Sequence, residues 1–225
     1  GHPWYINQEY NNHRDATYEE ILHLVHDYGI GIDGHNSFPG AMPEYQSEIR
    51  EAQKIALSNN LWGIDAERWI NELIDENSLT QEYLAALIDS YYGLWGAWTD
   101  SNTHGMWGIY VAKTRDEILT EDPIGAEIMN NKFFHPHLTY NARIDSSFNG
   151  NFSLRFDSSK PYTNHSQYLK DITLLGSNDI SVSINPLDNN ITGNQGINTV
   201  IFSGNSSEYI INISDNKASV IDKIS

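Results

Sequence analysis

The sequence predicts an α+β protein in which a helical half is followed by an all-β half. Residues before about position 134 have apolar side chains at helical spacing and include all six tryptophans. Later residues are rich in Asn, Ser, Thr, Ile and Gly, and form short alternating runs between turn residues. No flexible Gly/Ser linker separates the halves. We therefore expect residues 1–134 and 135–225 to be two domains that pack closely.

Helices are expected wherever an apolar stripe lies between helix start and stop residues. The first begins at Thr17 and ends at Gly29 or Gly31. The second begins at Pro43, because proline suits the first turn of a helix. The expected helices cover residues 17–29, 43–60, 65–75, 80–92 and 121–131.

Strands are expected throughout the second half, separated by turns such as Ser177-Asn178-Asp179 and Asn194-Gln195-Gly196. The expected strands cover residues 138–144, 151–156, 169–175, 180–184, 199–202, 209–213 and 218–221. This spacing of short strands is typical of an all-β module.

The composition excludes several classes of protein. The chain has 30 acidic and 13 basic residues, a formal net charge of −17 and no cysteine. Such acidity repels the phosphates of nucleic acids. The absence of cysteine excludes disulfides, thiolate metal ligands and a cysteine nucleophile. No apolar run approaches the roughly 18 residues that a membrane span needs. We expect no nucleic-acid partner and no membrane span.

The first helix has a stripe of ionisable residues opposite an apolar face. The apolar face, which we expect to point into the core, contains Tyr18, Ile21, Leu22, Val25 and Tyr28. The opposite arc contains Glu19, Glu20, His23, His26 and Asp27. Glu19 and His23 are four residues apart, so their side chains are neighbours that can share a metal ion. A solvated helix face with internal Glu–His pairs is the alternative interpretation.

The fourth helix offers a third metal ligand. Its core face contains Leu84, Leu87, Ile88 and Tyr91, and Glu82 and Asp89 lie opposite. The small side chains of Ala85 and Ala86 would let another helix or a substrate approach Glu82. The alternative is an ordinary exposed glutamate. His35, in a glycine-rich loop after the first helix, is a further candidate ligand.

Four segments, in this order, resemble those of the anthrax-lethal-factor-like metallopeptidases, which are gluzincins. Residues 15–30 (DATYEEILHLVHDYGI) resemble the active-site helix of that family, which contains H-E-x-x-H. Residues 53–63 (QKIALSNNLWG) resemble its A-x-x-x-G-L-W segment, and residues 81–85 (QEYLA) are similar to its E-Y-F-A-E helix. Residues 113–123 (KTRDEILTEDP) resemble its T-R-E-E-L…D-P segment.

The resemblance implies metal-assisted peptide hydrolysis on a zincin-like domain. It implies Glu20 as the general base and His23 and Glu82 as metal ligands, and it places Glu19 where the family has its first ligand histidine. The metal would polarise the scissile carbonyl and activate water, and Glu20 would accept the proton. Two carboxylates around one imidazole bind zinc less selectively than a two-histidine site, so calcium or manganese are alternatives. A peptidase fold that has lost its chemistry is the rival hypothesis.

The second half resembles segments that adjoin calcium-binding repeat-in-toxin (RTX) arrays of secreted bacterial proteins. Residues 152–157 (FSLRFD), 162–169 (YTNHSQYL), 174–178 (LLGSN) and 199–210 (TVIFSGNSSEYI) contribute to this resemblance. Residues 193–200 (GNQGINTV) resemble one copy of the nonapeptide G-G-x-G-x-D-x-U-x, with Asn198 in place of the aspartate. The resemblance implies a β-roll or solenoid-like module and calcium ions as partners. An ordinary Gly-Asn turn is the alternative.

Three hypotheses for the function follow. The first is an extracellular bacterial metallopeptidase, exported by type 1 secretion, that acts on peptide or protein substrates. The second is an inactive relic that acts as a binding or adhesion module, in which the helical half caps a calcium-binding β-solenoid, because such coils need protected ends. The third is an enzyme that acts on polysaccharides, since aromatic side chains stack on sugars.

Overall fold

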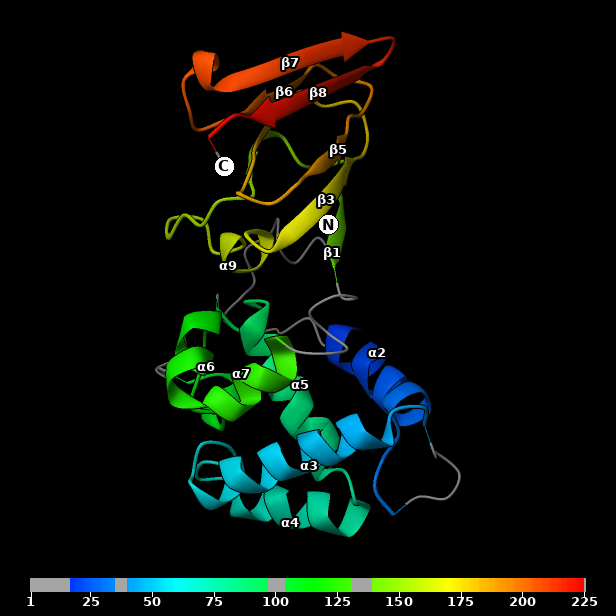
Figure 1. The fold of residues 1–225 in the computed structure, drawn as a ribbon, viewed down its shortest axis with the longest axis vertical. Helices are drawn as coiled ribbons and strands as arrows, with labels where there is room; N and C mark the ends of the chain where they lie inside the picture. The colour runs from blue at the N-terminus through cyan, green and yellow to red at the C-terminus, as the bar shows by residue number, and fades with distance from the viewer. Residues whose placement is uncertain (1–16, 35–39, 97–103, 131–138, 225) are drawn as a thin grey trace.

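The computed structural model describes residues 17–34, 40–96, 104–130 and 139–224. Within these ranges the helices lie mostly in the first half and the strands in the second (Figure 1). This confirms the mixed α+β class. The predicted domain boundary at residues 134 and 135 lies outside the described ranges.

The helical half agrees with most of the predicted helices. It contains α2 (Thr17–Val25), the π-helical turn η1 (His26–Ile30), α3 (Pro43–Ser58), α4 (Glu67–Glu76), α5 (Leu79–Tyr91), the 3-10 turn η2 (Met106–Gly108), α6 (Arg115–Glu121) and α7 (Pro123–Asn130). The prediction missed α6. Its start is a capping box, in which the Thr114 hydroxyl accepts the Glu117 N–H and the Glu117 carboxylate accepts the Thr114 N–H.

Helix α5 is the centre of the helical half. Its residues from Thr80 to Tyr91 are buried, apart from Glu82, and α2, α3, α4, α6 and α7 all contact it. The prediction that Asp89 lies opposite the core was wrong. Asp89 is buried and accepts a hydrogen bond from Trp95 Nε1 at 2.8 Å. The surrounding helices bury most of α5, so its buried polar residues need internal partners.

The β half winds through two parallel sheets. One sheet has the order β1 (Tyr140–Ile144), β3 (Leu169–Leu174) and β5 (Asn190–Thr192), and the other has β2 (Gly150–Ser153), β4 (Ile180–Ser183) and β6 (Asn198–Ile201). Successive strands alternate between the sheets, so each turn of the chain adds one strand to both. The chain ends with an antiparallel hairpin of β7 (Tyr209–Ser214) and β8 (Lys217–Asp222) (Figure 1).

The second half is less purely β than predicted. A short helix, α9 (Thr163–Ser166), and a 3-10 turn, η3 (Ser206–Glu208), interrupt the strands. The prediction also missed β5, which is only three residues long. Alternate residues of the longer strands fill the space between the sheets, including Ile172, Ile180 and Val182.

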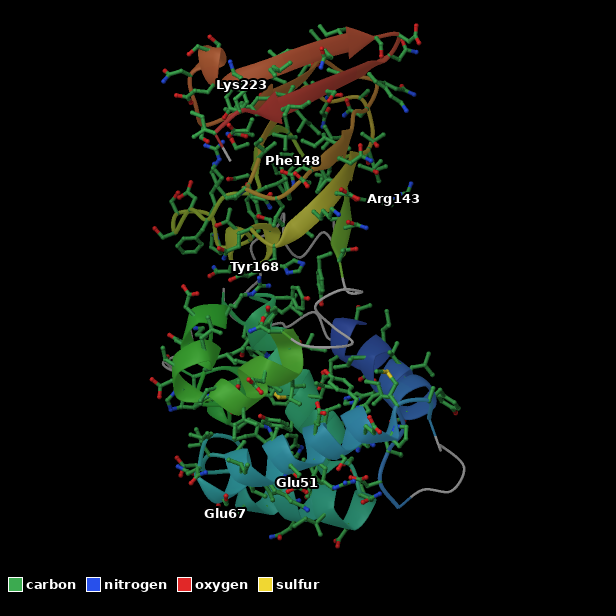
Figure 2. The ribbon with its side chains drawn as sticks, viewed as in Figure 1. Glu51, Glu67, Arg143, Phe148, Tyr168 and Lys223 are labelled. Carbon is green, nitrogen blue, oxygen red and sulfur yellow. The ribbon has the colours of Figure 1, made fainter. Side chains whose placement is uncertain are left out.

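The two halves share a packed boundary. The Arg115 guanidinium of α6 lies between the rings of Tyr91 and Tyr168, 3.9 and 3.7 Å from their centroids. Tyr168, which precedes β3, lies at the edge of the β half that faces the helices (Figure 2). Arg115 Nε also donates to the Tyr91 carbonyl at 2.8 Å. A cation between two aromatic faces therefore links the halves.

A second contact at this boundary depends on glycine. Tyr92 stacks on Tyr140 with ring centroids 4.1 Å apart, and His165 Nδ1 lies 2.7 Å from the Tyr92 carbonyl, to which it donates. Gly93 has φ +68°, and a Cβ there would lie 2.0 Å from the Asn164 carbonyl oxygen. A side chain at position 93 would therefore push the halves apart. Among the described residues, no helix is long and apolar enough to cross a membrane.

Candidate metal centre

Helix α2 is turned about its axis relative to the prediction. Ile21, Val25 and Tyr28, expected in the core, are 56%, 38% and 66% exposed. Leu22 is buried as expected, and the side chain of Tyr18 lies outside the description. Among the side chains that the structure describes, α2 and η1 bury Glu19, Leu22, His26 and Ile30. Much of the ionisable stripe therefore faces α5 and α3, where polar side chains offer it partners.

Tight backbone contacts fix the end of this helix. At His26 the backbone widens into the π-helical turn η1, which ends at Gly31 with φ 107°. The chain then returns alongside it, since the Ala41 N–H donates to the Gly29 carbonyl at 2.8 Å. A Cβ on Gly40 would lie 2.1 Å from the Ile30 carbonyl oxygen, so only glycine fits there. π-Helical turns of this kind are frequent at functional sites.

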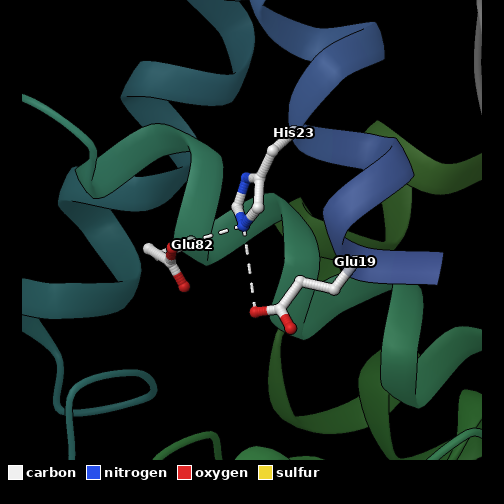
Figure 3. A group of neighbouring side chains, drawn as sticks. All are labelled: Glu19, His23 and Glu82. Carbon is white, nitrogen blue, oxygen red and sulfur yellow. Dashed lines mark ion pairs between the residues drawn. The ribbon is translucent and has the colours of Figure 1, made fainter. Parts of the chain in front are cut away.

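The structure brings three of the predicted site residues together. His23 Nε2 lies 3.3 Å from Glu82 Oε1 and 3.8 Å from Glu19 Oε1 (Figure 3). One ligand atom from each of the three lies within 4.8 Å of the other two. Glu19 and His23 come from successive turns of α2, and Glu82 comes from the first turn of α5. Glu19 is buried, whereas His23 and Glu82 remain partly open to solvent.

The two carboxylates control the charge of the histidine. Burial of the ring by itself lowers the pKa of His23. Hydrogen bonds from the ring to Glu19 and Glu82, together with their negative charges, outweigh this effect and raise the pKa to about 10. Without a metal ion, His23 is therefore an imidazolium held between two carboxylates at neutral pH.

The same three side chains fit a divalent cation. A tetrahedral zinc ion with bonds of about 2.0–2.1 Å separates its ligand atoms by about 3.3 Å. The His23–Glu82 distance of 3.3 Å matches this value, and the Glu19–His23 distance of 3.8 Å needs only a small side-chain movement. Two carboxylates and a neutral imidazole would balance the charge of the ion. The oxygen-rich set also suits manganese or calcium.

Glu20, the predicted general base, lies outside this group. It is exposed on α2, next to Glu19 in the chain. Its carboxylate is not one of the three ligand atoms that lie within 4.8 Å of one another. Its catalytic role stays a prediction. His35, the further candidate ligand, lies outside the described residues.

Sequence reasoning missed the partner of His26. His26 Nε2 lies 2.6 Å from Gln46 Oε1 of α3, and both side chains are buried. Burial also lowers the pKa of His26, so this ring is neutral. A signal was present in the sequence, because Gln46 and Gln53 lie seven residues apart among the core-facing apolar residues of α3. Polar residues on the inner face of a helix need internal partners.

The turn with the predicted calcium motif is held by asparagine side chains. Asn198 Oδ1 accepts the Asn194 N–H at 2.8 Å, and Asn198 Nδ2 donates to Asn194 Oδ1 at 2.8 Å. Asn194 Nδ2 in turn donates to the carbonyl oxygens of Leu175 and Asn178 in the preceding turn. Residues 193–200 contain no carboxylate. These bonds support the alternative interpretation, an ordinary Gly-Asn turn.

Comparison of the chain with protein-family models, with curated proteins and with solved structures finds no match.

Proposed function

We propose that the helical half is a divalent-metal-binding domain with a peptidase-like site, in which Glu19, His23 and Glu82 hold the ion. The observation that supports this proposal most strongly is their convergence. Three ligand atoms from two helices lie within 4.8 Å of one another, and they belong to residues at the three positions where the gluzincin resemblance implies metal ligands. The proposal includes zinc, manganese and calcium as candidate ions.

The orientation of α2 gives independent support. Ile21 and Leu24, at 56% and 60% exposure, face solvent while Glu19 is only 6% exposed. Exposing apolar side chains and burying a carboxylate both cost stability. Natural sequences break these rules mainly at functional sites. A bound cation would compensate the buried charge of Glu19, a role that the His23 imidazolium has in the metal-free protein.

The proposed chemistry is peptide-bond hydrolysis. A divalent ion at this site supplies Lewis-acid polarisation of a substrate carbonyl. Glu19, His23 and Glu82 hold and orient that ion. Glu20, exposed beside Glu19, is the proposed proton acceptor for the attacking water. The proposed setting is extracellular, because an acidic chain without cysteine suits a secreted protein, and the RTX resemblance favours type 1 secretion.

Two glutamate variants and one control test this function. The full chain is freed of metal, loaded with zinc, manganese or calcium, and incubated with casein and a peptide library. We expect cleavage with at least one ion. Glu20→Gln should lower the rate by about a hundredfold or more and leave metal binding unchanged. Glu82→Ala should lose both metal and activity. Glu76→Gln, on an exposed residue at the end of α4, should change neither.

The two parts of the proposal fail separately. If no ion supports cleavage although the metal binds, the enzyme hypothesis fails and the metal-binding role remains. If Glu82→Ala binds metal as tightly as the unaltered chain, the assigned site is wrong.

A second candidate role, the end cap of a β-solenoid, is also supported by the packing. The first turn of the β half lies against the helices through the Tyr92–Tyr140 stack. Inward-facing residues at the other end are less covered, because Val200 of β6 is 39% exposed whereas Val182, its partner in β4, is 1% exposed. Hydrogen exchange of the full chain tests this role. Arg115→Ala should speed exchange in β1 and β3, and equal protection would argue against a cap.

A further inference from the structure

A chain of buried polar side chains runs beside the proposed metal site. His26 Nε2 lies 2.6 Å from Gln46 Oε1, and Gln46 Nε2 donates to Thr80 Oγ1 at 3.2 Å. Thr80 Oγ1 donates to Gln81 Oε1 at 3.0 Å, and Gln81 Nε2 donates to Asp27 Oδ1 at 3.5 Å. His26, Gln46, Thr80 and Gln81 are all buried. We call these five residues the polar chain.

The hydrogen bonds of the polar chain have one direction. A carboxamide oxygen can only accept a hydrogen bond, so His26 must donate its Nε2–H to Gln46 Oε1. The Gln46 amide then donates onward to Thr80, whose hydroxyl donates to Gln81. Each member therefore fixes the orientation of the next. His26 Nδ1 is left buried without a hydrogen-bond partner among the described residues, so the ring is held through Nε2 alone.

The polar chain joins the two elements that provide the proposed ligands. His26 lies three residues after His23, at the start of η1. Gln81 directly precedes Glu82 in the first turn of α5. Gln46 of α3 bridges the two sides, since it bonds to His26 on one side and to Thr80 on the other.

We propose that Gln46 is a positioning residue for the metal site, since it fixes the separation between the His23 turn and the Glu82 turn through His26 and Thr80. The inference rests on the proposed metal-binding role of Glu19, His23 and Glu82. Residues that orient ligands without touching the ion commonly change metal affinity by about 10–100-fold. Because Gln46 acts through helix placement, its effect belongs at the lower end of that range.

A matched pair of variants in α3 separates positioning from mere packing. Gln46→Leu breaks the polar chain, whereas Gln53→Leu removes a buried glutamine seven residues later whose Nε2 has no partner within the described residues. Affinity of the full chain for Mn²⁺ and Zn²⁺ is measured by titration calorimetry, and the Co²⁺ complex by visible absorption. We expect about tenfold weaker binding and an altered Co²⁺ spectrum for Gln46→Leu. Gln53→Leu should match the unaltered chain.

A second pair tests the same point if Gln46→Leu does not fold. Thr80→Val keeps the size of the side chain but removes the hydroxyl, so it should weaken metal binding. Thr80→Ser keeps the hydroxyl and should bind metal as tightly as the unaltered chain. In the metal-free protein, imidazole nitrogen NMR should find the proton of His26 on Nε2.

The outcomes distinguish the inference from the proposed function. If the unaltered chain binds none of the ions, the proposed function and this inference fall together. If it binds them but Gln46→Leu and Thr80→Val bind as tightly, only the inference is overturned. A proton on Nδ1 of His26 would also overturn it, because the polar chain would then lack its first donor.

Discussion

His23 is held between two carboxylates, and its proton stabilises the metal-free fold. Its pKa is raised from 6.5 to about 10 by Glu19 and Glu82. Because the pKa of His23 is higher in the folded than in the unfolded protein, the folded protein binds the proton of His23 more tightly. This contribution is therefore complete below about pH 6.5 and is lost as the pH rises through about 10.

The pH dependence of unfolding tests this arrangement. In chelator-treated protein, the free energy of unfolding, measured with urea, should fall between pH 7 and 10 by more in the unaltered chain than in His23→Gln. Taking the difference between the two proteins removes the contribution of other titrating groups. A difference that stays constant over this range would contradict the imidazolium between two carboxylates.

Asp122 is a buried carboxylate with several donors. Its Oδ2 accepts the hydroxyls of Tyr83 and Tyr110 at 2.7 and 3.0 Å, and its Oδ1 accepts the Gly125 N–H at the start of α7. Burial and the nearby negative charge raise the pKa of both tyrosines, so they remain donors. Asp122→Ala leaves these donors buried and should cost about 3 kcal/mol or more of unfolding free energy.

The exposed Asp188→Ala is the control for that measurement, with an expected change within about 0.5 kcal/mol. Equal stabilities of the two variants would mean that water satisfies the tyrosines, which would contradict the buried arrangement.

At the scale of elements, α2 shows where sequence reasoning fails. The helix itself was predicted, as were α3, α4 and α5, because apolar spacing, Pro43 and the glycine stops are local signals. The orientation of α2 was predicted wrongly, because hydrophobicity alone places Ile21 and Val25 in the core. The polar partners of the side that α2 buries, Glu82 and Gln46, come from other helices. No local pattern contains that information.

Two leucines of α2 test its orientation. Leu24 is 60% exposed and Leu22 is buried, although they lie only two residues apart. Leu24→Gln should change the unfolding free energy by no more than about 0.5 kcal/mol, whereas Leu22→Ala should lower it by about 2–5 kcal/mol. Urea denaturation measures both. A large cost for Leu24→Gln with a small cost for Leu22→Ala would contradict the orientation that α2 has in the structure.

The missed elements have different physical reasons. The capping box at Thr114 and Glu117 is a local signal for α6 that the sequence contains but that was not used. Strand β5, by contrast, has only Ile191 between Asn190 and Thr192, which is too short for a pattern. It forms because β3 offers it a parallel partner. The joining of Glu19 and His23 with Glu82 was expected from the resemblance, since spacing along one helix cannot place a residue of another.

At the scale of the molecule, the two halves are expected to unfold together. Arg115 lies between Tyr91 of the helical half and Tyr168 of the β half. All six tryptophans lie before position 134, so their fluorescence reports the helical half alone, whereas circular dichroism also reports the strands. The two signals should give one coincident transition in urea. Arg115→Ala should give two transitions, one seen by fluorescence and one seen by circular dichroism. Separate transitions in the unaltered chain would mean that the halves are independent.

The most direct test of the account is the position of a bound ion. Crystals of the full chain grown with Mn²⁺ or Zn²⁺ are measured at wavelengths where these ions scatter anomalously. The account predicts one anomalous peak about 2.0–2.2 Å from Glu19 Oε1, His23 Nε2 and Glu82 Oε1. A peak at other residues, or none at these three under conditions where the chain binds the ion in solution, would contradict it.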